Sequence, residues 1–430
     1  MTKTVKILVL LYFLLIMLLE FSVTNFRSIK EKQTLSLLKT KKNELENNFT
    51  AIPLSTGKNL DVLNSAVVYG ANASGKSNLI KALRAMLRII NNSFSYQVSK
   101  GVKNIEPFLL AKDSVNQPTA FELDLIDGGV RYVYGFSATQ EKIIDEWLYQ
   151  YPKGSPQNLI DRKSTNQWGT MSALKGKKKI WQESTKDNSL FLSTAVQLNS
   201  ESLATIFSAI DKLKGLSDGL SQGFGYTCHQ ANENKESKEE ILEFMKTADI
   251  GIEDFVVSKE TAEEAKISDE MKELLVKKGE DLSKIKLFKV ESQHTSDDGS
   301  VVSFDFREQE SEGTQKLFNL AGPWLNVLKN GYCLVMDELH NSLHPKLAAY
   351  LVSMFHNPEI NKHGAQLIFV THETSLLNQD TFRKDQVWFC EKENNVTELF
   401  SLADFKVRKG VDNLESAYLS GRYGAVPYLK

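Results

Sequence analysis

The sequence predicts an α/β protein with a mixed, mostly parallel sheet, an antiparallel β part near the N-terminus and an inserted, mainly helical lobe. Two observations carry this prediction. Strand and helix patterns alternate from Val301 onward, as they do in parallel sheets. Earlier in the chain, residues 70–77 read Gly-Ala-Asn-Ala-Ser-Gly-Lys-Ser, directly after the apolar run 66–69 and at the start of a helical pattern from Lys76 to about Ile90.

The composition is that of an ordinary globular chain, with one large domain and an insertion or with two or three domains. The chain has 430 residues, of which 41% are hydrophobic and 25% are charged. A net charge of −2 gives no overall attraction to nucleic acids or anionic membranes, so such a partner would need a local basic patch. The three cysteines are far apart and odd in number, which argues against a disulfide framework or a zinc knuckle and favours a reducing, cytoplasmic location.

The N-terminus carries an uninterrupted apolar run from Ile7 to Leu19. The run is short for a membrane span, and no small-residue cleavage site follows it. The next residues, up to Thr24, alternate like a half-buried strand. We therefore expect residues 1–16 to be an upstream extension of the reading frame or an extra apolar arm, before a domain that begins near Met17, and we expect no membrane partner. A membrane anchor is the alternative.

The rest of the chain is expected to form three parts. The first contains the strand-rich start, the glycine-rich loop and a β-subdomain, the second an inserted basic loop and helical lobe, and the third the remainder of the α/β fold: residues 17–150, 151–300 and 301–430. In the first part, alternating runs at 121–126 and 130–136 flank Asp127-Gly128-Gly129 and predict a β-hairpin, with a further strand at 143–149. In the second, Ser200 to Lys286 is expected to be mostly helical.

The third part has the clearest order of elements. The patterns predict strands at 301–306, 332–336, 366–370 and 386–390, and helices at 312–329 and 345–355.

Basic residues gather between residues 150 and 185. Lys175 and Lys177–Lys179 lie near Trp168 and Trp181. Basic residues interleaved with aromatic ones can bind a nucleic-acid backbone and stack on bases, so DNA is a candidate partner. The alternative, which we favour, is a solvated hairpin turn.

The glycine-rich loop predicts a phosphate site. The backbone N–H groups of its first six residues can turn inward around a phosphate, and the following helix N-terminus adds a favourable dipole: Gly70, Ala71, Asn72, Ala73, Ser74 and Gly75. Lys76 is expected to reach the β- and γ-phosphates, and the Ser77 hydroxyl to bind Mg²⁺. The loop therefore predicts binding of ATP or a related nucleotide, with a glycine-rich structural turn as the alternative.

Polar residues follow two of the predicted strands in the third part. Cys333 to Met336 ends in Asp337 and Glu338. Asp337 is expected to contact Mg²⁺ opposite Ser77, and Glu338 to orient and deprotonate the attacking water. The strand at 366–370 is followed by Thr371 and His372, and a neutral His372 could hydrogen-bond the γ-phosphate.

A second phosphate-facing surface is predicted at the helix that precedes Asp337. Ser311-Glu-Gly-Thr-Gln315 places a hydroxyl residue and a glycine, Gly313, at a helix N-terminus. Taken alone, this is an ordinary helix cap. Because one sheet offers one nucleotide crevice and the chain already has a phosphate loop, we expect this surface to serve the nucleotide of another subunit.

These motifs, in this order, resemble the ABC-class ATPases that are not transporters, the RecF, SMC and OLD group. The resemblance implies an ABC-type P-loop ATPase fold. It makes residues 70–77 the Walker A loop, Ser311 to Gln315 a variant signature motif, Asp337 and Glu338 the Walker B pair, residues 339–344 the D-loop and His372 the switch histidine. Asn25-Phe26-Arg27-Ser28 is similar to the start of such domains, whose arginine, here Arg27, lies near the nucleotide. The Q-loop glutamine is not identified.

Two segments narrow the resemblance to bacterial abortive-infection ATPases of the RloA and OLD-like kind. They are Asp337-Glu-Leu-His-Asn-Ser-Leu-His-Pro345 and Tyr418-Leu-Ser-Gly-Arg-Tyr-Gly-Ala-Val-Pro427. The likeness covers about residues 17–430. Most members would have Asp where this chain has His340, so its D-loop departs from the pattern. His340 and His344 also have the spacing of a metal pair, but no third ligand is evident.

The resemblance favours an ATPase that acts as sensor and regulator of an anti-phage defence system. OLD proteins carry a C-terminal nuclease, for which this chain leaves no room after its last predicted strand, so we expect the nuclease or toxin effector on a separate chain. The alternatives are a RecF-like repair ATPase that binds DNA and a scaffold that barely hydrolyses ATP, although Glu338 argues against the scaffold. An ABC transporter subunit does not fit the large insertion. We expect a homodimer or larger homo-oligomer assembled through shared ATP sites.

Overall fold

The structure is a computed structural model that describes residues 15–42, 44–216, 220–247, 251–265, 267–277 and 280–427. Most of the expected extension, residues 1–14, lies outside the described residues. The description starts with Leu15, which is buried, and with β1 (Ile16–Thr24), in which Met17 is fully buried. None of the helices in the described ranges has the length and hydropathy needed to span a bilayer.

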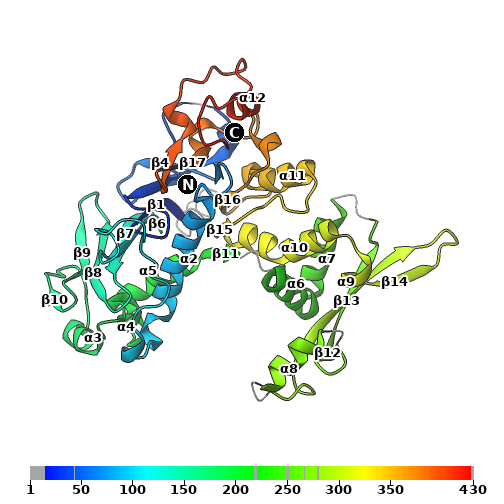
Figure 1. Cartoon of the computed structure of the whole chain (residues 1–430), viewed down its shortest axis with the longest axis horizontal. Helices are drawn as coiled ribbons and strands as arrows, with labels where there is room; N and C mark the ends of the chain where they lie inside the picture. Colours follow the sequence, from blue (N-terminus) through cyan, green and yellow to red (C-terminus); the bar gives the residue numbers. More distant parts are fainter. Residues whose placement is uncertain are drawn as a thin grey trace, which may run out of the picture. The chain divides into compact units, whose positions relative to one another are not determined.

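The chain folds as two compact units (Figure 1). The first comprises residues up to Gly215 together with Val327–His340 and Ala348–Lys430. The second comprises Leu216–Asn326 and Asn341–Leu347. The basic segment between residues 150 and 185 therefore belongs to the first unit.

A six-stranded sheet in the first unit carries the predicted motifs. Its order is β11 (Leu213–Leu216), β15 (Cys333–Met336), β16 (Gln366–Val370), β5 (Ser65–Tyr69), β17 (Val387–Glu393) and β18 (Val396–Ser401). The four strands β15, β16, β5 and β17 run parallel, and β18 is antiparallel to β17. All residues of β15, β16 and β5 are buried, as continuous apolar runs require in a sheet that is covered on both faces. The predicted mixed sheet is confirmed.

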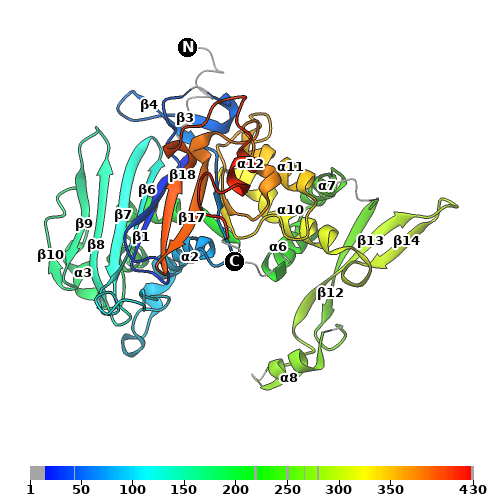
Figure 2. The same cartoon turned by 45° about the horizontal axis from the view of Figure 1, so that its top comes forward.

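The predicted antiparallel β part is a seven-stranded sheet, whose strands lie side by side in Figure 2. Its order is β10 (Gln167–Trp168), β9 (Gln157–Lys163), β8 (Ile143–Tyr151), β7 (Val130–Ala138), β6 (Thr119–Asp127), β1 and β2 (Gln33–Ser36). The predicted hairpin joins β6 and β7, and its turn residues Gly128 and Gly129 both have positive φ, as two-residue hairpin loops prefer. Strands β9 and β10 were not predicted, and a separate hairpin is formed by β3 (Phe49–Pro53) and β4 (Asn59–Leu63).

Helix α2 (Lys76–Asn92) joins the two large sheets into one core. Its apolar side chains recur at helical spacing, for example at Leu79, Leu83, Met86 and Ile90, and all four are buried. One hydrophobic cluster runs from β1 and β6 through this helix to the inner strands of the six-stranded sheet. Helices α3 (Lys178–Ser184), α4 (Phe191–Gln197), α5 (Glu201–Asp211), α11 (Pro345–His356) and α12 (Leu414–Leu419) complete the first unit.

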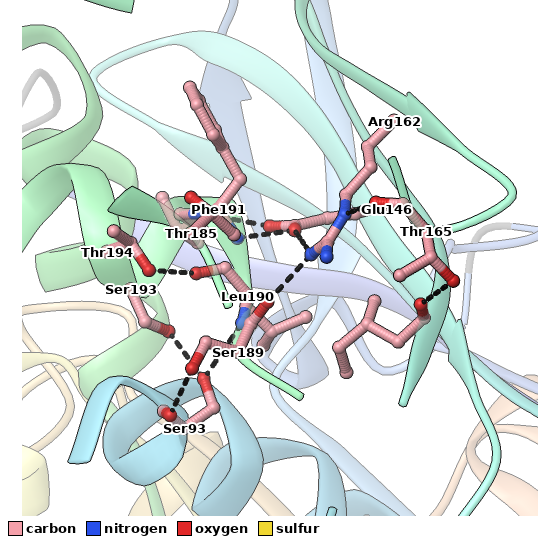
Figure 3. A network of polar contacts seen from close by, with 12 residues as sticks. Ser93, Glu146, Arg162, Thr165, Thr185, Ser189, Leu190, Phe191, Ser193 and Thr194 are labelled. Atoms are coloured by element: carbon pink, nitrogen blue, oxygen red, sulfur yellow. Dashed lines mark hydrogen bonds and ion pairs between the residues drawn. The ribbon is translucent and has the colours of Figure 1, made fainter. Parts of the chain in front are cut away.

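A buried polar network ties β8 and β9 to helix α4 (Figure 3). The fully buried Glu146 carboxylate accepts hydrogen bonds from the N–H groups of Phe191 (2.6 Å) and Leu192 (2.9 Å), at the N-terminus of α4. Arg162 lies 3.8 Å from the same carboxylate and donates to the carbonyl oxygens of Thr165 and Ser189. The network satisfies two buried charges that the sequence gives no reason to pair.

The second unit contains helices and a small sheet (Figure 1). Its elements are α6 (Leu220–Glu233), α7 (Lys235–Lys246), β12 (Asp254–Thr261), α8 (Asp269–Lys277), β13 (Lys286–Thr295), β14 (Val301–Asp305), α9 (Phe306–Gln309) and most of α10 (Glu312–Asn330). The expected helices are present between Ser200 and Lys286, but β12 was missed. It pairs with β13, which pairs with the predicted β14, and Phe255 and Phe306 pack against Phe318 of α10.

The two tryptophans of the basic segment pack against other side chains of the protein, Trp181 buried and Trp168 half-buried. Trp181 is only 4% exposed, and the Trp168 ring lies 5.2 Å from the Phe191 ring and 5.3 Å from the Arg162 guanidinium. The Lys178 ammonium donates to the carbonyl oxygen of Met171 (2.6 Å). Both indoles are thus engaged in contacts within the protein, whereas the other three lysines of the segment are exposed: Lys175, Lys177 and Lys179.

Candidate functional site

The three segments expected to form the nucleotide site follow adjacent parallel strands. Strand β16 lies between β15 and β5, with Met336 opposite Phe369 and Val370 opposite Val68. The carboxyl ends of these strands therefore lie at one edge of the sheet, which is where ligands bind in open α/β sheets. Residues 70–77, Asp337 with Glu338, and Thr371 with His372 leave the sheet at this edge.

The phosphate loop lies close to neighbouring backbone and side chains. Gly75 has φ 107°, and a Cβ there would collide with the side chain of Thr397. A Cβ at Gly70 would collide with the carbonyl oxygen of Cys390. The tip of the loop, Asn72 and Ala73, is exposed. Both glycines are thus required by the packing of the loop on strands β17 and β18, and the tip stays open to a ligand.

Two residues that the sequence did not single out support this loop. The Thr397 hydroxyl lies 2.8 Å from the carbonyl oxygen of Ser74 and donates to it, and it lies 2.7 Å from the Ser28 hydroxyl. The Asn78 amide, in the first turn of α2, also donates to the Ser28 hydroxyl (2.7 Å). Ser28 closes the Asn-Phe-Arg-Ser segment and could have been found from it, whereas Thr397 lies in a strand that no motif marks.

Lys76 points its ammonium into the loop. Its Nζ donates to the carbonyl oxygens of Gly70 (2.7 Å) and Ala71 (2.9 Å). Burial lowers the pKa of Lys76, and the charges of Asp337 and Glu338 act in the opposite direction. The phosphate loop and the two carboxylates therefore influence one another electrostatically, as the predicted site requires.

The donor groups at this edge fit a nucleotide with Mg²⁺. Ser77 supplies a half-buried hydroxyl beside Lys76, and Asp337 supplies a carboxylate that is 9% exposed. Hydroxyl and carboxylate oxygens are ligands that Mg²⁺ prefers, usually together with phosphate oxygens. Within the described ranges there is no group of three or more His, Cys, Asp or Glu side chains that could hold a metal ion, so His340 and His344 have no third ligand of these types there.

Glu338 and His372 lie beside each other at the open edge. His372 Nε2 is 3.8 Å from the Glu338 carboxylate, and Glu338 has a left-handed backbone with φ 51°, which is uncommon for residues other than glycine. Burial lowers the pKa of His372, and the positive charge of Lys76 lowers it further, whereas Glu338 raises it. These effects together favour the neutral imidazole, whose single N–H can donate a hydrogen bond to a phosphate.

His340 joins this group of side chains. Its Nδ1 shares a hydrogen bond of 2.8 Å with the Thr371 hydroxyl, and its ring lies 6.1 Å from the His372 ring. The residue at which this chain departs from the related pattern therefore contacts Thr371, the residue before His372.

Arg27 lies next to the loop through its neighbour Ser28, but its guanidinium is paired elsewhere. Its Nη2 lies 2.8 Å from the carboxylate of Glu106, and its backbone N–H donates to the Glu106 carbonyl oxygen (2.7 Å). Its Nε is buried without a hydrogen-bond partner. Nucleotide contact by Arg27 stays a prediction.

The predicted signature residues lie in the second unit. The Ser311 hydroxyl accepts a hydrogen bond from the Thr314 N–H (3.2 Å), so Ser311 caps α10. A Cβ at Gly313 would come within 2.8 Å of the Ser342 carbonyl oxygen. The Gln315 amide donates to the carbonyl oxygens of Arg307 and Glu310, which fixes the turn before the helix. Ser311 is exposed, so it is accessible to a partner, whereas Gln315 is engaged in local structure.

Comparison with known proteins gives one extensive family match. The family model described as "AAA domain, putative AbiEii toxin, Type IV TA system" matches residues 65–378, more than half of the chain. The match begins at β5 and includes the phosphate loop, the signature segment, Asp337, Glu338 and His372. No curated protein is significantly similar to the chain.

Solved structures of similar architecture have low sequence identity. An SMC head bound to the C-winged helix domain of ScpA is 13% identical, with 89% of this chain and 97% of that chain covered and a TM-score of 0.45. The SMC head domain from Thermotoga maritima is 13% identical, with 91% of this chain and 99% of that chain covered and a TM-score of 0.40. The recombination mediator protein RecF with ATP is 14% identical, with 90% of this chain and 98% of that chain covered and a TM-score of 0.36. These similarities are too weak to assign a role to any residue.

Proposed function

Because the chain belongs to the AAA-domain family of putative AbiEii toxins and is an ABC-class P-loop ATPase, we propose that it is the sensor and regulator of an abortive-infection defence system. In this proposal ATP binding and hydrolysis control a separate effector protein, a nuclease or a toxin. The observation that carries the proposal is the convergence of Lys76, Glu338 and His372 at the phosphate loop, within a chain of this family.

Each of these residues has one task in the proposed reaction. Lys76 leaves the loop carbonyl oxygens to hold the β- and γ-phosphates, Glu338 accepts a proton from the attacking water, and His372 hydrogen-bonds the γ-phosphate. Ser77 and Asp337 would hold Mg²⁺, which when bound would neutralise charge on the phosphate oxygens.

The site is completed by a second copy of the chain. We place Ser311 and Gly313 of one protomer against the ATP held by residues 70–77 of another. ATP binding then stabilises the assembly and hydrolysis releases it, because a ligand that binds only the assembled form shifts the equilibrium towards it. The exposure of Ser311 at the start of a 19-residue helix supports this arrangement.

Replacement of Glu338 tests the cycle. Glu338→Gln should bind ATP but lower its hydrolysis at least about 100-fold, since a general base typically contributes that much. It should therefore remain associated in ATP, as measured by light scattering, while Lys76→Ala neither binds ATP nor associates. A Glu338→Gln protein that stays monomeric in saturating ATP would rule out the shared site.

Function in the cell separates the two candidate roles. A defence regulator expressed with its flanking genes should reduce phage plaque counts, and Glu338→Gln should abolish that protection. The RecF-like repair function is supported by the exposed Lys175, Lys177 and Lys179. DNA-stimulated ATPase activity that is lost when these three lysines become glutamine, without any effect on phage, would favour repair.

A further inference from the structure

The C-terminal segment that follows the family match packs behind the nucleotide site. The match ends at residue 378, but the chain continues through β17 and β18 to helix α12 (Leu414–Leu419). Helix α12 overlaps the start of the segment Tyr418 to Pro427. The proposed function gives this segment no role. Its contacts reach two places at the open edge of the sheet.

The first contact is with the phosphate loop. The Tyr418 hydroxyl donates to the Ala425 carbonyl oxygen (3.1 Å), and the backbone N–H of Gly70, the first loop residue, faces this hydroxyl closely enough to lower its pKa. The Tyr418 ring lies 5.9 Å from the Tyr69 ring and stacks on Phe389 at 5.4 Å. Burial is the larger effect and raises the pKa of Tyr418 to about 12, so its hydroxyl stays protonated and donates to Ala425 while its oxygen faces the Gly70 N–H.

The second contact is with the segment that follows His372. The Thr374 hydroxyl, two residues after the histidine, donates to the Glu415 carboxylate in α12 (2.6 Å). A few residues on, the Gln379 amide donates to the Asp412 carbonyl oxygen, just before α12 (2.6 Å). One turn of helix therefore separates Tyr418, which lies against the phosphate loop, from Glu415, which contacts residues 372–374, here called the switch segment.

The segment around α12 is itself firmly held. The Asn413 side chain accepts from the Ser416 N–H (2.8 Å) and caps the helix. Tyr423 is 1% exposed and also stacks on Phe389, at 5.6 Å, and the Ala425 N–H donates to Glu391 of β17 (3.2 Å). A segment fixed in this way can transmit a displacement from one contact to the other.

We propose that α12 is a positioning element that couples the phosphate loop to the switch segment, with Tyr418 holding Gly70 and Glu415 holding Thr374. Tyr418 sets the conformation of the loop in which ATP binds. Glu415 sets the place of His372 relative to that loop and so acts on hydrolysis. This inference rests on the proposed ATP site, and it assigns to the C-terminal segment a role in coupling the binding of ATP to its hydrolysis.

The Tyr418 contact is tested by a pair of matched substitutions. Tyr418→Phe keeps the stacked ring but removes the hydroxyl, so ATP should bind about 3- to 10-fold more weakly, the effect of one lost hydrogen bond. Tyr423→Phe is the control, because the Tyr423 hydroxyl is buried without a hydrogen-bond partner. It should leave the Kd unchanged in calorimetry. Equal Kd values for the two variants and the unaltered chain would overturn the role of Tyr418.

The Glu415 contact is tested by separating binding from turnover. Glu415→Ala should lower kcat about 3- to 10-fold and leave the Kd for ATP unchanged. Glu415→Gln should restore kcat, because its amide oxygen can still accept from Thr374, and Thr374→Val should reproduce the loss. An unchanged kcat in Glu415→Ala, or a loss that Glu415→Gln does not rescue, would overturn the role of Glu415. If the unaltered chain bound no ATP, the proposed function itself would fail, an outcome that is distinct from both.

Discussion

Burial changes the chemistry of individual residues in the first unit in ways that bear on stability as well as on the site. His356, at the end of α11, is almost fully buried, and burial lowers its pKa to about 4. Its Nε2 lies 2.8 Å from the hydroxyl of Ser65, at the start of β5, and 3.3 Å from the Gln386 amide, just before β17. A neutral imidazole thus links a helix to two strands of the six-stranded sheet.

This histidine should make the fold sensitive to acid. The unfolded chain would take up a proton near pH 6.5, whereas the folded chain resists it down to about 4, so the unfolded state binds more protons between these values and stability falls as the pH falls. The full loss is about 3 kcal/mol. His356→Gln should remove this part of the slope, as measured by thermal unfolding between pH 7 and pH 4. Parallel curves for the variant and the unaltered chain would contradict the assignment.

The site residues that the sequence could identify are those that a local motif places just after a strand of the parallel sheet. Glu338 and His372 lie two residues after their strands and Lys76 ends the loop that follows β5, so the strand order of an α/β sheet is enough to bring them to one edge. Thr397 bonds the Ser74 carbonyl oxygen and the Ser28 hydroxyl, and all three residues come from segments far apart in sequence. No local pattern encodes a contact of that kind, and Tyr418 was visible only as part of a family segment, without a task.

At the level of elements, helix α4 depends on a charge supplied by β8. Its N-terminal N–H groups are satisfied by Glu146, a buried carboxylate whose pKa is raised by burial and lowered by Arg162. Glu146→Ala should cost about 3–5 kcal/mol, because it leaves Arg162 buried without its counter-charge. Glu146→Gln should cost less, since its oxygen can still accept from α4. Glu141→Ala, on the exposed turn before β8, is the control in denaturant unfolding, and equal losses for Glu141 and Glu146 would refute the account.

The elements that the sequence predicted correctly are those with unambiguous burial. Strands β5, β15 and β16 are buried on both faces and therefore read as continuous apolar runs. Strand β12 has the sequence DFVVSKET and buries only Phe255, so its charged, exposed positions read as part of the acidic helical region. Strand β9 is held through the buried Arg162, a polar residue that pattern reading assigns to a surface.

For the whole molecule, the proposed site draws its two halves from different units of different copies. Residues 70–77 lie in the first unit and Ser311 lies in the second. An isologous pair would contain two such sites, each with the loop of one protomer and the signature residues of the other. If one protomer carries a defective loop and the other a defective signature, both defects fall in the same site. The second site of that pair is then intact.

Mixing two inactive variants tests this arrangement. Lys76→Ala disables the loop, and Ser311→Asp keeps a good helix cap while placing a negative charge where the partner's phosphate would lie. Each should be inactive alone. In a mixed pair, the intact loop of the Ser311→Asp chain faces the intact Ser311 of the Lys76→Ala chain. An equimolar mixture should therefore regain ATPase activity, up to about half of the normal rate, since a mixed pair carries one good site of two. Ser311→Asn, which caps the helix without charge, should remain active alone. A mixture that shows only the sum of its parts would place the complete site within one chain.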